Sequence, residues 1–216
     1  MKKISYFIAI VIFNGCTTVA SNEIIKLDSQ SITTESPNII EAKLESTPFD
    51  IWERIRLELT LKIPEDQIAS TSVYRERLYK NQSAVNRISK SGQRYLYHTL
   101  TRAEELGLPV ELALLPFVES EFDPYAKSID GATGIWQFMP ATGKEWGLKS
   151  NWWYDGKKDV LASTEAALQF LTYLHEKFDG DWLLAMAAYN TGPTRVNRAI
   201  RKNKRENKPI RFWDLN

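Results

Sequence analysis

Apolar residues recur every four positions between residues 162 and 178. Ala162, Ala166, Phe170, Leu174 and Phe178 fall on one face of an α-helix, because the helix has about 3.6 residues per turn. Other segments show the same kind of spacing, and little of the chain alternates apolar and polar residues as a strand would. The pattern therefore predicts an all-α fold.

Glycine, proline and capping residues divide this pattern into segments. We expect Asp181 to cap one helix, Thr47 and Pro48 to begin another with Asp50 in its first turn, and Pro116 to kink a third. Helices are predicted over residues 48–63, 83–106, 109–119, 140–146, 159–178, 182–190 and 193–200, with a polar connection over 64–82 and a loop over 128–139.

The chain has 216 residues, of which 43% are apolar, so one domain with extensions is expected. The formal net charge is +1, and Lys and Arg form no dense run. Nucleic acid is therefore not an expected partner.

Residues 1–15 are predicted to be a lipoprotein-type signal peptide. A basic start is followed by an apolar stretch over 4–13 that is too short to span a bilayer. Cys16 is the only cysteine, so it cannot form a disulfide within the chain. The segment resembles a bacterial lipoprotein signal, which is cleaved before a cysteine that then carries lipid, and this resemblance implies that Cys16 is the lipidation site. The alternative is an ordinary secretory signal with an incidental cysteine. Residues 16–46 are polar and predict a lipid-anchored flexible tether, and residues 47–216 predict the folded domain.

Glu119 follows an uncharged run, Leu112–Val118. Removing a carboxyl from water disfavours its charged form, which suits a proton donor that works near neutral pH. The alternative is a buried acid whose hydrogen bonds are satisfied by neighbours and which has no catalytic role.

Three ordered motifs carry a resemblance to a known family. Glu119-Ser120, the segment GATGIWQFMPAT at 131–142 and AYNTG at 188–192 resemble motifs of the family 1 lytic transglycosylases, which are SLT-type domains of the lysozyme-like superfamily. The resemblance covers about residues 47–214. It implies a lysozyme-like helical domain with a substrate groove.

The resemblance also implies a reaction and a partner. The reaction is cleavage of the β-1,4 bond between N-acetylmuramic acid and N-acetylglucosamine in peptidoglycan glycan strands, with a 1,6-anhydro end and no consumption of water. Glu119 would be first the acid and then the base. Most glycoside hydrolases need a second carboxyl, but an internal sugar hydroxyl as nucleophile removes that need. Of the acids that follow, Glu121 should face elsewhere on the helix and Asp123, before a proline, should make a turn.

Further residues receive roles from the resemblance. The implied substrate-binding residues are Ser120, Ser128, Gln137, Phe138, Met139, Tyr189 and Asn190. Tyr189 and Asn190 would orient Glu119 and the substrate's N-acetyl group, although a tyrosine on an apolar helix is more often a core residue. Phe138 and Met139 would line the groove, and Gly131 and Gly134 would let the backbone approach the saccharide.

Other chemistry is not expected. His98 and His175 have no partners at metal-ligand spacing, so neither a metal site nor a cofactor is predicted. Trp152 and Trp153 could stack on sugar rings or cover the core, and the core position is favoured.

The end of the chain bears on activity. The family usually continues past the Phe212–Leu215 segment into a helical stretch with a catalytic-site tyrosine, and often into wall-binding repeats, so the domain is interpreted as truncated at its C-terminus. The alternatives are a lysozyme-type hydrolase of the same fold and a non-catalytic wall-binding lipoprotein. The expected location is the periplasmic face of the bacterial envelope, on the outer membrane, anchored through Cys16.

Overall fold

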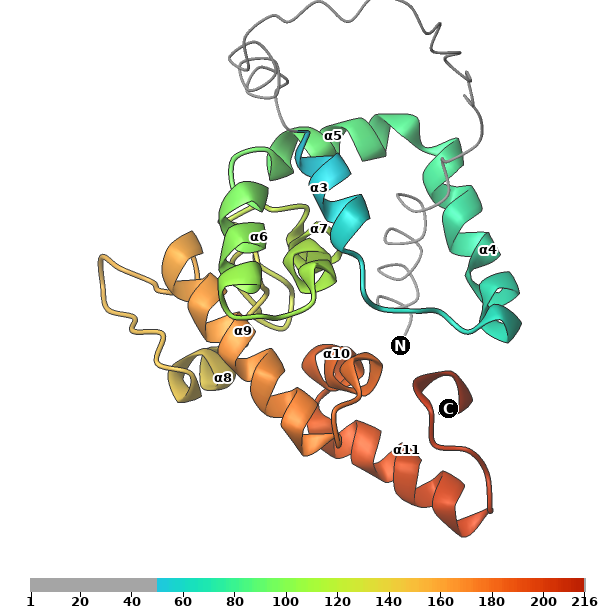
Figure 1. The fold of residues 1–216 in the computed structure, drawn as a ribbon. Helices are drawn as coiled ribbons and strands as arrows, with labels where there is room; N and C mark the ends of the chain where they lie inside the picture. Colours follow the sequence, from blue (N-terminus) through green and yellow to red (C-terminus); the bar gives the residue numbers. More distant parts are fainter. Residues whose placement is uncertain (1–49, 216) are drawn as a thin grey trace, which may run out of the picture.

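A computed structural model describes residues 50–215 of the chain (Figure 1). Its elements are α3 (Ile51–Glu58), α4 (Glu65–Lys80), α5 (Gln82–Gly92), α6 (Leu96–Glu105), the 3₁₀ helix η1 (Val110–Leu114), α7 (Leu115–Ser120), α8 (Pro140–Glu145), α9 (Val160–Lys177), α10 (Trp182–Thr191), α11 (Pro193–Arg205) and the 3₁₀ helix η2 (Phe212–Asp214). The described part contains only isolated β-bridges and no strand, so the all-α prediction is confirmed. The predicted signal peptide, Cys16 and the tether lie outside the described residues. Within those residues, no helix is both long and apolar enough to cross a bilayer.

The core is built around α10. This helix packs against α9 on one side and α11 on the other (Figure 1). Its buried residues are Leu184, Ala185, Met186, Ala187 and Ala188. A helix that is apolar on all sides is stable only when other elements surround it. The residues that follow this stretch, Tyr189 and Asn190, are therefore carried to the edge of the core.

Aspartate side chains fix the start of three helices. Asp181 accepts a hydrogen bond from the Leu184 amide at 3.0 Å, which confirms the predicted N-cap of α10. Asp159 caps α9 in the same way. Asp50 accepts a hydrogen bond from the Trp52 amide at 3.0 Å and is therefore the N-cap of α3. It had been expected further on, within the first turn of the helix.

The predicted polar connection over residues 64–82 is wrong, because most of it is helix α4 (Glu65–Lys80). Glu65 and Asp66 lie in the first turn and Arg77 and Lys80 in the last, where their charges favour the helix dipole. Most of the helix is solvent-exposed, so it has no sustained apolar stripe from which periodicity could have detected it.

The single helix predicted over residues 83–106 is also wrong. It is divided into α5 and α6, with a turn after Gly92. A Cβ atom on Gly92 would lie 2.9 Å from the ring of Phe117, so the absence of a side chain lets α7 pack closely there. The chain then changes direction before α6 begins at Leu96.

The segment 109–119 differs from the predicted kinked helix. It begins as η1 and continues as α7, and Pro116 lies in the first turn of α7, where the missing N–H costs no helical hydrogen bond. The C-terminal helix α11 extends to Arg205, beyond the predicted end at residue 200. Because η1 and α7 are separate elements, Glu119 lies near the end of the short helix α7.

Candidate active site

Glu119 and Asn190 meet at the ends of two helices. Glu119 lies near the C-terminus of α7 and Asn190 near the C-terminus of α10. The Nδ2 amide of Asn190 donates a hydrogen bond to Oε1 of Glu119 at 3.0 Å. Both side chains are half-buried. The structure thus joins the first and third sequence motifs in one hydrogen-bonded pair.

Tyr189 connects α10 to the second motif. Its hydroxyl donates to the backbone carbonyl of Trp136 at 2.8 Å, and its ring packs edge-on against Phe138 with centroids 6.2 Å apart. Burial, together with the nearby negative charge of Glu119, raises the pKa of Tyr189 well above its ordinary value. The phenol is therefore neutral at physiological pH and acts as a hydrogen-bond donor to the loop.

Two further hydrogen bonds hold the loop that carries the second motif. The hydroxyl of Ser120, next to Glu119, donates to the carbonyl of Ile135 at 2.9 Å. The indole of Trp136, which is fully buried, donates to the hydroxyl of Thr164 on α9 at 3.0 Å. The loop is thereby fixed against α7, α9 and α10 at once.

Ser128 and Gln137 make contacts inside this loop. Oγ of Ser128 accepts a hydrogen bond from the Ala132 amide at 3.0 Å. Nε2 of Gln137 donates to the carbonyls of Gly134 at 2.9 Å and Ala126 at 3.3 Å. The side-chain amide nitrogen of Gln137 therefore stabilises the backbone of the loop itself. This role differs from the expected hydrogen bond to the sugar.

Phe138 and Met139, both expected to line the groove, lie in different environments. Phe138 is 2% exposed and belongs to the core, whereas Met139 is 42% exposed. Only Met139 presents a substantial surface to solvent. Of the two, it is the residue that can contact a ligand without rearrangement of the core.

Gly134 serves a different purpose from the expected one. Its φ is +83°, and a Cβ atom there would lie 1.8 Å from the backbone oxygen of Lys157. The close approach that requires glycine is thus between two protein segments, not between the protein and a saccharide. Gly131, with φ +89°, has open space where a Cβ would be.

The acids that follow Glu119 have structural partners. Glu121 accepts two hydrogen bonds from the guanidinium of Arg87, at 2.9 and 3.0 Å. Asp123 accepts from the Tyr125 amide at 2.9 Å, which agrees with its predicted place in a turn.

Sequence reasoning did not detect how the turn after Glu119 is held. Glu121 and Phe122 both have left-handed backbone conformations, with φ of 54° and 60°, which are uncommon outside glycine. Phe122 is buried against Phe117, and Arg87 and Ser91 on α5 bind Glu121. No motif signals this arrangement, because it depends on a contact between distant parts of the chain.

The two neighbouring tryptophans lie on the surface of the protein. Trp152 and Trp153 are 89% and 68% exposed, so the core position favoured for them is wrong. Among residues 50–215, no group of three or more His, Cys, Asp or Glu side chains could hold a metal ion.

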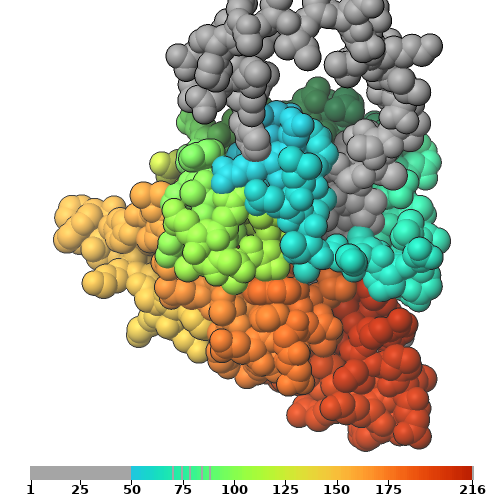
Figure 2. Space-filling view, in the orientation of Figure 1, coloured from blue at the N-terminus to red at the C-terminus, as the bar shows by residue number. Residues whose placement is uncertain are grey.

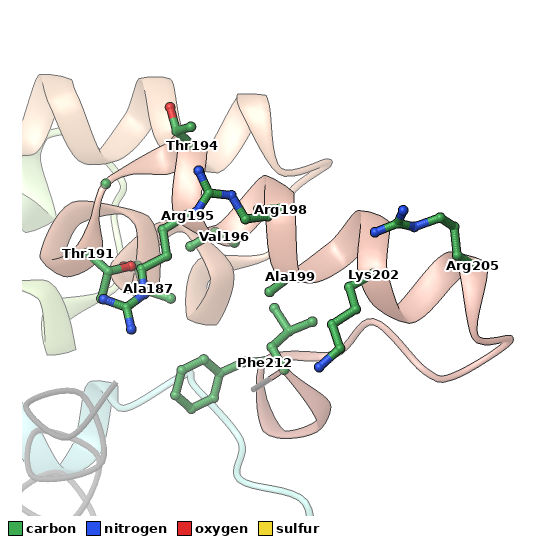
Figure 3. A pocket seen from close by; sticks show the side chains of 12 residues that line it. Ala187, Thr191, Thr194, Arg195, Val196, Arg198, Ala199, Lys202, Arg205 and Phe212 are labelled. Atoms are coloured by element: carbon green, nitrogen blue, oxygen red, sulfur yellow. The ribbon is translucent and has the colours of Figure 1, made fainter.

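A separate basic pocket lies along α11. It has a volume of about 650 Å³ and is lined by cationic residues of α11, including Arg195, Arg198 and Lys202, and by Phe212 and other apolar side chains (Figure 3). Ala187 and Thr191 on the last turns of α10 also line the pocket, but none of the predicted substrate-binding residues does. It is therefore distinct from the site around Glu119.

Comparison of the sequence with known proteins places the chain in a family. The model of the transglycosylase SLT domain matches residues 90–212, a range that includes Glu119, the loop of the second motif and Asn190. Membrane-bound lytic murein transglycosylase D of Escherichia coli (strain K12) is 43% identical over 167 residues, which are 77% of this chain and 36% of that protein.

Two further relatives match shorter segments. Peptidoglycan transglycosylase gp16 of Escherichia phage T7 is 42% identical over 89 residues, 39% of this chain and 6% of that protein. Soluble lytic murein transglycosylase of Salmonella typhimurium is 30% identical over 108 residues, 47% of this chain and 16% of that protein. The chain spans about a third of the length of the Escherichia coli relative. Because the family model matches more than half of its residues, the chain belongs to the transglycosylase SLT domain family.

Proposed function

We propose that this protein is a peptidoglycan lytic transglycosylase. It cleaves the β-1,4 bond between N-acetylmuramic acid and N-acetylglucosamine and leaves a 1,6-anhydro end. The proposal draws on the names of the relatives, which include lytic murein transglycosylases. The observation that carries it is the hydrogen bond between Asn190 and Glu119, which holds one carboxyl at the junction of the family's motifs.

Glu119 would act first as a general acid. It gives its proton to the glycosidic oxygen as the bond from that oxygen to C1 of the muramic acid breaks. Asn190 donates to Oε1, so Oε1 acts as an acceptor and Oε2 is the oxygen expected to carry the proton. The substrate's N-acetyl oxygen would stabilise the positive charge that develops at C1.

Glu119 would then act as a base. The carboxylate takes the proton from the C6 hydroxyl of the same sugar while O6 bonds to C1. The proton count balances, because the proton given to the leaving sugar is replaced by the one taken from C6. Ring closure within one sugar also avoids the entropic cost of bringing in a separate nucleophile.

The partners of the neighbouring acids support a mechanism with one carboxyl. Two-acid glycosidases place their carboxyl groups about 5–9.5 Å apart on either side of the bond. Glu121 is instead engaged with Arg87, and Asp123 with the turn at Tyr125. This arrangement favours the transglycosylase over the lysozyme-type hydrolase.

Substitution of Glu119 tests the proposal. Glu119→Gln keeps the size and the hydrogen bond from Asn190 but cannot transfer a proton, so release of soluble fragments from purified sacculi should fall by about 10²-fold or more. Glu145→Gln, at an exposed glutamate of α8, is the matched control and should retain full activity. Normal release by a folded Glu119→Gln variant would exclude this residue as the acid.

We also propose that the protein is held at the periplasmic face of the envelope, on the outer membrane, by lipid on Cys16. The predicted signal motif and the name of the membrane-bound Escherichia coli relative support this location. Metabolic labelling with a fatty acid should be lost in Cys16→Ser. Label that persists in this variant would refute lipidation at this residue.

A further inference from the structure

The largest exposed aromatic side chains project from the connection between α8 and α9. Trp152 and Trp153 are mostly exposed, and their rings meet edge to face with centroids 4.6 Å apart. We call residues 148–158 the aromatic loop. It swings out from the body of the molecule in Figure 1 and forms the amber projection at the left of Figure 2. Exposed apolar groups of this size mark interaction sites more often than chance.

Hydrogen bonds pin the tip of the aromatic loop. The side-chain oxygen of Asn151 accepts from the amides of Trp153 at 3.1 Å and Tyr154 at 2.8 Å, and the Asn151 amide donates to the Tyr154 carbonyl at 2.7 Å. The tryptophan backbones are therefore held in a closed turn. A platform fixed in advance loses little entropy when it binds.

Polar contacts also fix the base of the loop. Nζ of Lys157 lies 2.6 Å from Asp155, whose carboxylate also accepts from Ser150 at 2.9 Å. The Tyr154 hydroxyl donates to Asp159 at 3.0 Å. Neither tryptophan ring takes part in these contacts. The rings are thus available to an external partner.

The base of the aromatic loop packs against the loop of the second motif. The backbone oxygen of Lys157 occupies the space beside Gly134 where a Cβ would otherwise lie. Gly134 belongs to the same loop as Trp136, whose carbonyl accepts the hydrogen bond from Tyr189. The aromatic loop therefore contacts the same loop that Ser120 and Tyr189 bind through hydrogen bonds.

We propose that Trp152 and Trp153 form an outlying subsite that stacks on sugar rings of the glycan strand, away from the bond that is cleaved. This inference rests on the proposed function. The substrate is a long polymer, so a surface next to the site meets sugars beyond the scissile bond. The face of a pyranose ring presents C–H groups, which the electron-rich face of an indole attracts.

Charge agrees with this occupant. Lys149 and Lys158 lie on either side of the two tryptophans in the chain, and both are exposed. The peptides of peptidoglycan carry carboxylates, so a glycan strand on the rings would bring negative charge toward these lysines. The combination of aromatic faces and cations fits a peptide-bearing glycan.

Binding in an inactive background tests the inference. Glu119→Gln protein is titrated with peptide-free glycan strands and, separately, with short oligosaccharides. Adding Trp152→Ala and Trp153→Ala together should weaken binding of long strands about tenfold or more and leave binding of short oligosaccharides unchanged. Tyr97→Ala, which removes a similarly exposed aromatic ring on α6, is the control and should change neither.

Each outcome has a defined meaning. Unchanged affinity for long strands in the double variant overturns the inference. Equal weakening for short and long ligands also overturns it, because the rings would then act at or near the cleavage site. Binding to anionic phospholipid vesicles that depends on the rings, with glycan affinity intact, would assign the loop to a membrane surface instead. Failure of the proposed function is seen separately, as a wild-type protein that binds strands but releases no fragments.

Discussion

The Nδ2 atom of Asn190 lies 3.0 Å from Oε1 of Glu119, although 71 positions separate the two residues in the chain. The contact depends on α10 being buried between α9 and α11, since this burial fixes where its last turn ends. Packing of the core therefore sets the orientation of the proposed catalytic carboxyl.

Replacing Asn190 should lower turnover more than substrate binding. Asn190→Ala removes the donor that holds Oε1 of Glu119, so kcat on isolated glycan strands should fall by about tenfold to a hundredfold while KM changes little. Steady-state kinetics would check this. A rise in KM at constant kcat would instead assign Asn190 to uniform substrate binding.

Tyr189→Phe should loosen the loop of the second motif. The substitution leaves the Trp136 carbonyl without its donor, which should cost about 1 kcal/mol of unfolding free energy and lower activity partly. Urea unfolding measures the first effect. Stability and activity equal to those of the wild type would mean that the hydroxyl does not hold the loop.

Glu111 should prove a structural acid. It is fully buried, and Oε1 accepts from the backbone amides of Thr60 at 2.7 Å and Leu61 at 2.6 Å. Glu111→Leu strands both amides without an acceptor and should cost about 3 kcal/mol or more, which is measurable as a lower Tm. Glu53→Gln, on the exposed surface of α3, is the control. A Tm drop no larger than that of the control would contradict this role.

Acid stability should depend on the pair formed by Arg102 and Glu165. Hydrogen bonding to Arg102 lowers the pKa of Glu165 in the folded protein below its ordinary 4.5. A lowered folded-state pKa means that the pair stabilises the fold above pH 4.5 and that this contribution is lost as pH falls through the folded value. Because both side chains are about a third exposed, the contribution should be under about 1 kcal/mol.

The comparison of unfolding free energies at several pH values tests this dependence. Glu165→Gln cannot ionise, so its stability should decline less than that of the wild type between neutral pH and pH values below 4.5. Parallel declines in the two proteins would show that the pair makes no pH-dependent contribution.

Local rules predicted the helices with apolar stripes and caps. The interval-of-four pattern gave α9, and the Asp181 cap gave the start of α10. The break after Gly92 could not be predicted, because glycine is tolerated inside helices and the contact that requires glycine there is with the ring of Phe117, which comes from another helix. Helix α4 was missed because an exposed helix shows no apolar stripe.

The candidate site was predictable only in part. The residues Glu119, Tyr189 and Asn190 came from motif order, which implies that they meet but not how. The clamp of Arg87 on Glu121 has no local signal. Trp152 was placed in the core because large apolar residues are usually buried. In the structure, hydrogen bonds to Asn151 hold the loop, and the ring of Trp152 is exposed.

The composition of the cleavage products tests the proposed chemistry most directly. Glycan strands are digested by the wild-type protein in water labelled with heavy oxygen, and the fragments are weighed by mass spectrometry. Closure of the C6 hydroxyl on C1 predicts anhydro ends that are lighter than hydrolysed ends by one water molecule and carry no label. Labelled reducing ends would contradict it and would identify a lysozyme-type hydrolase.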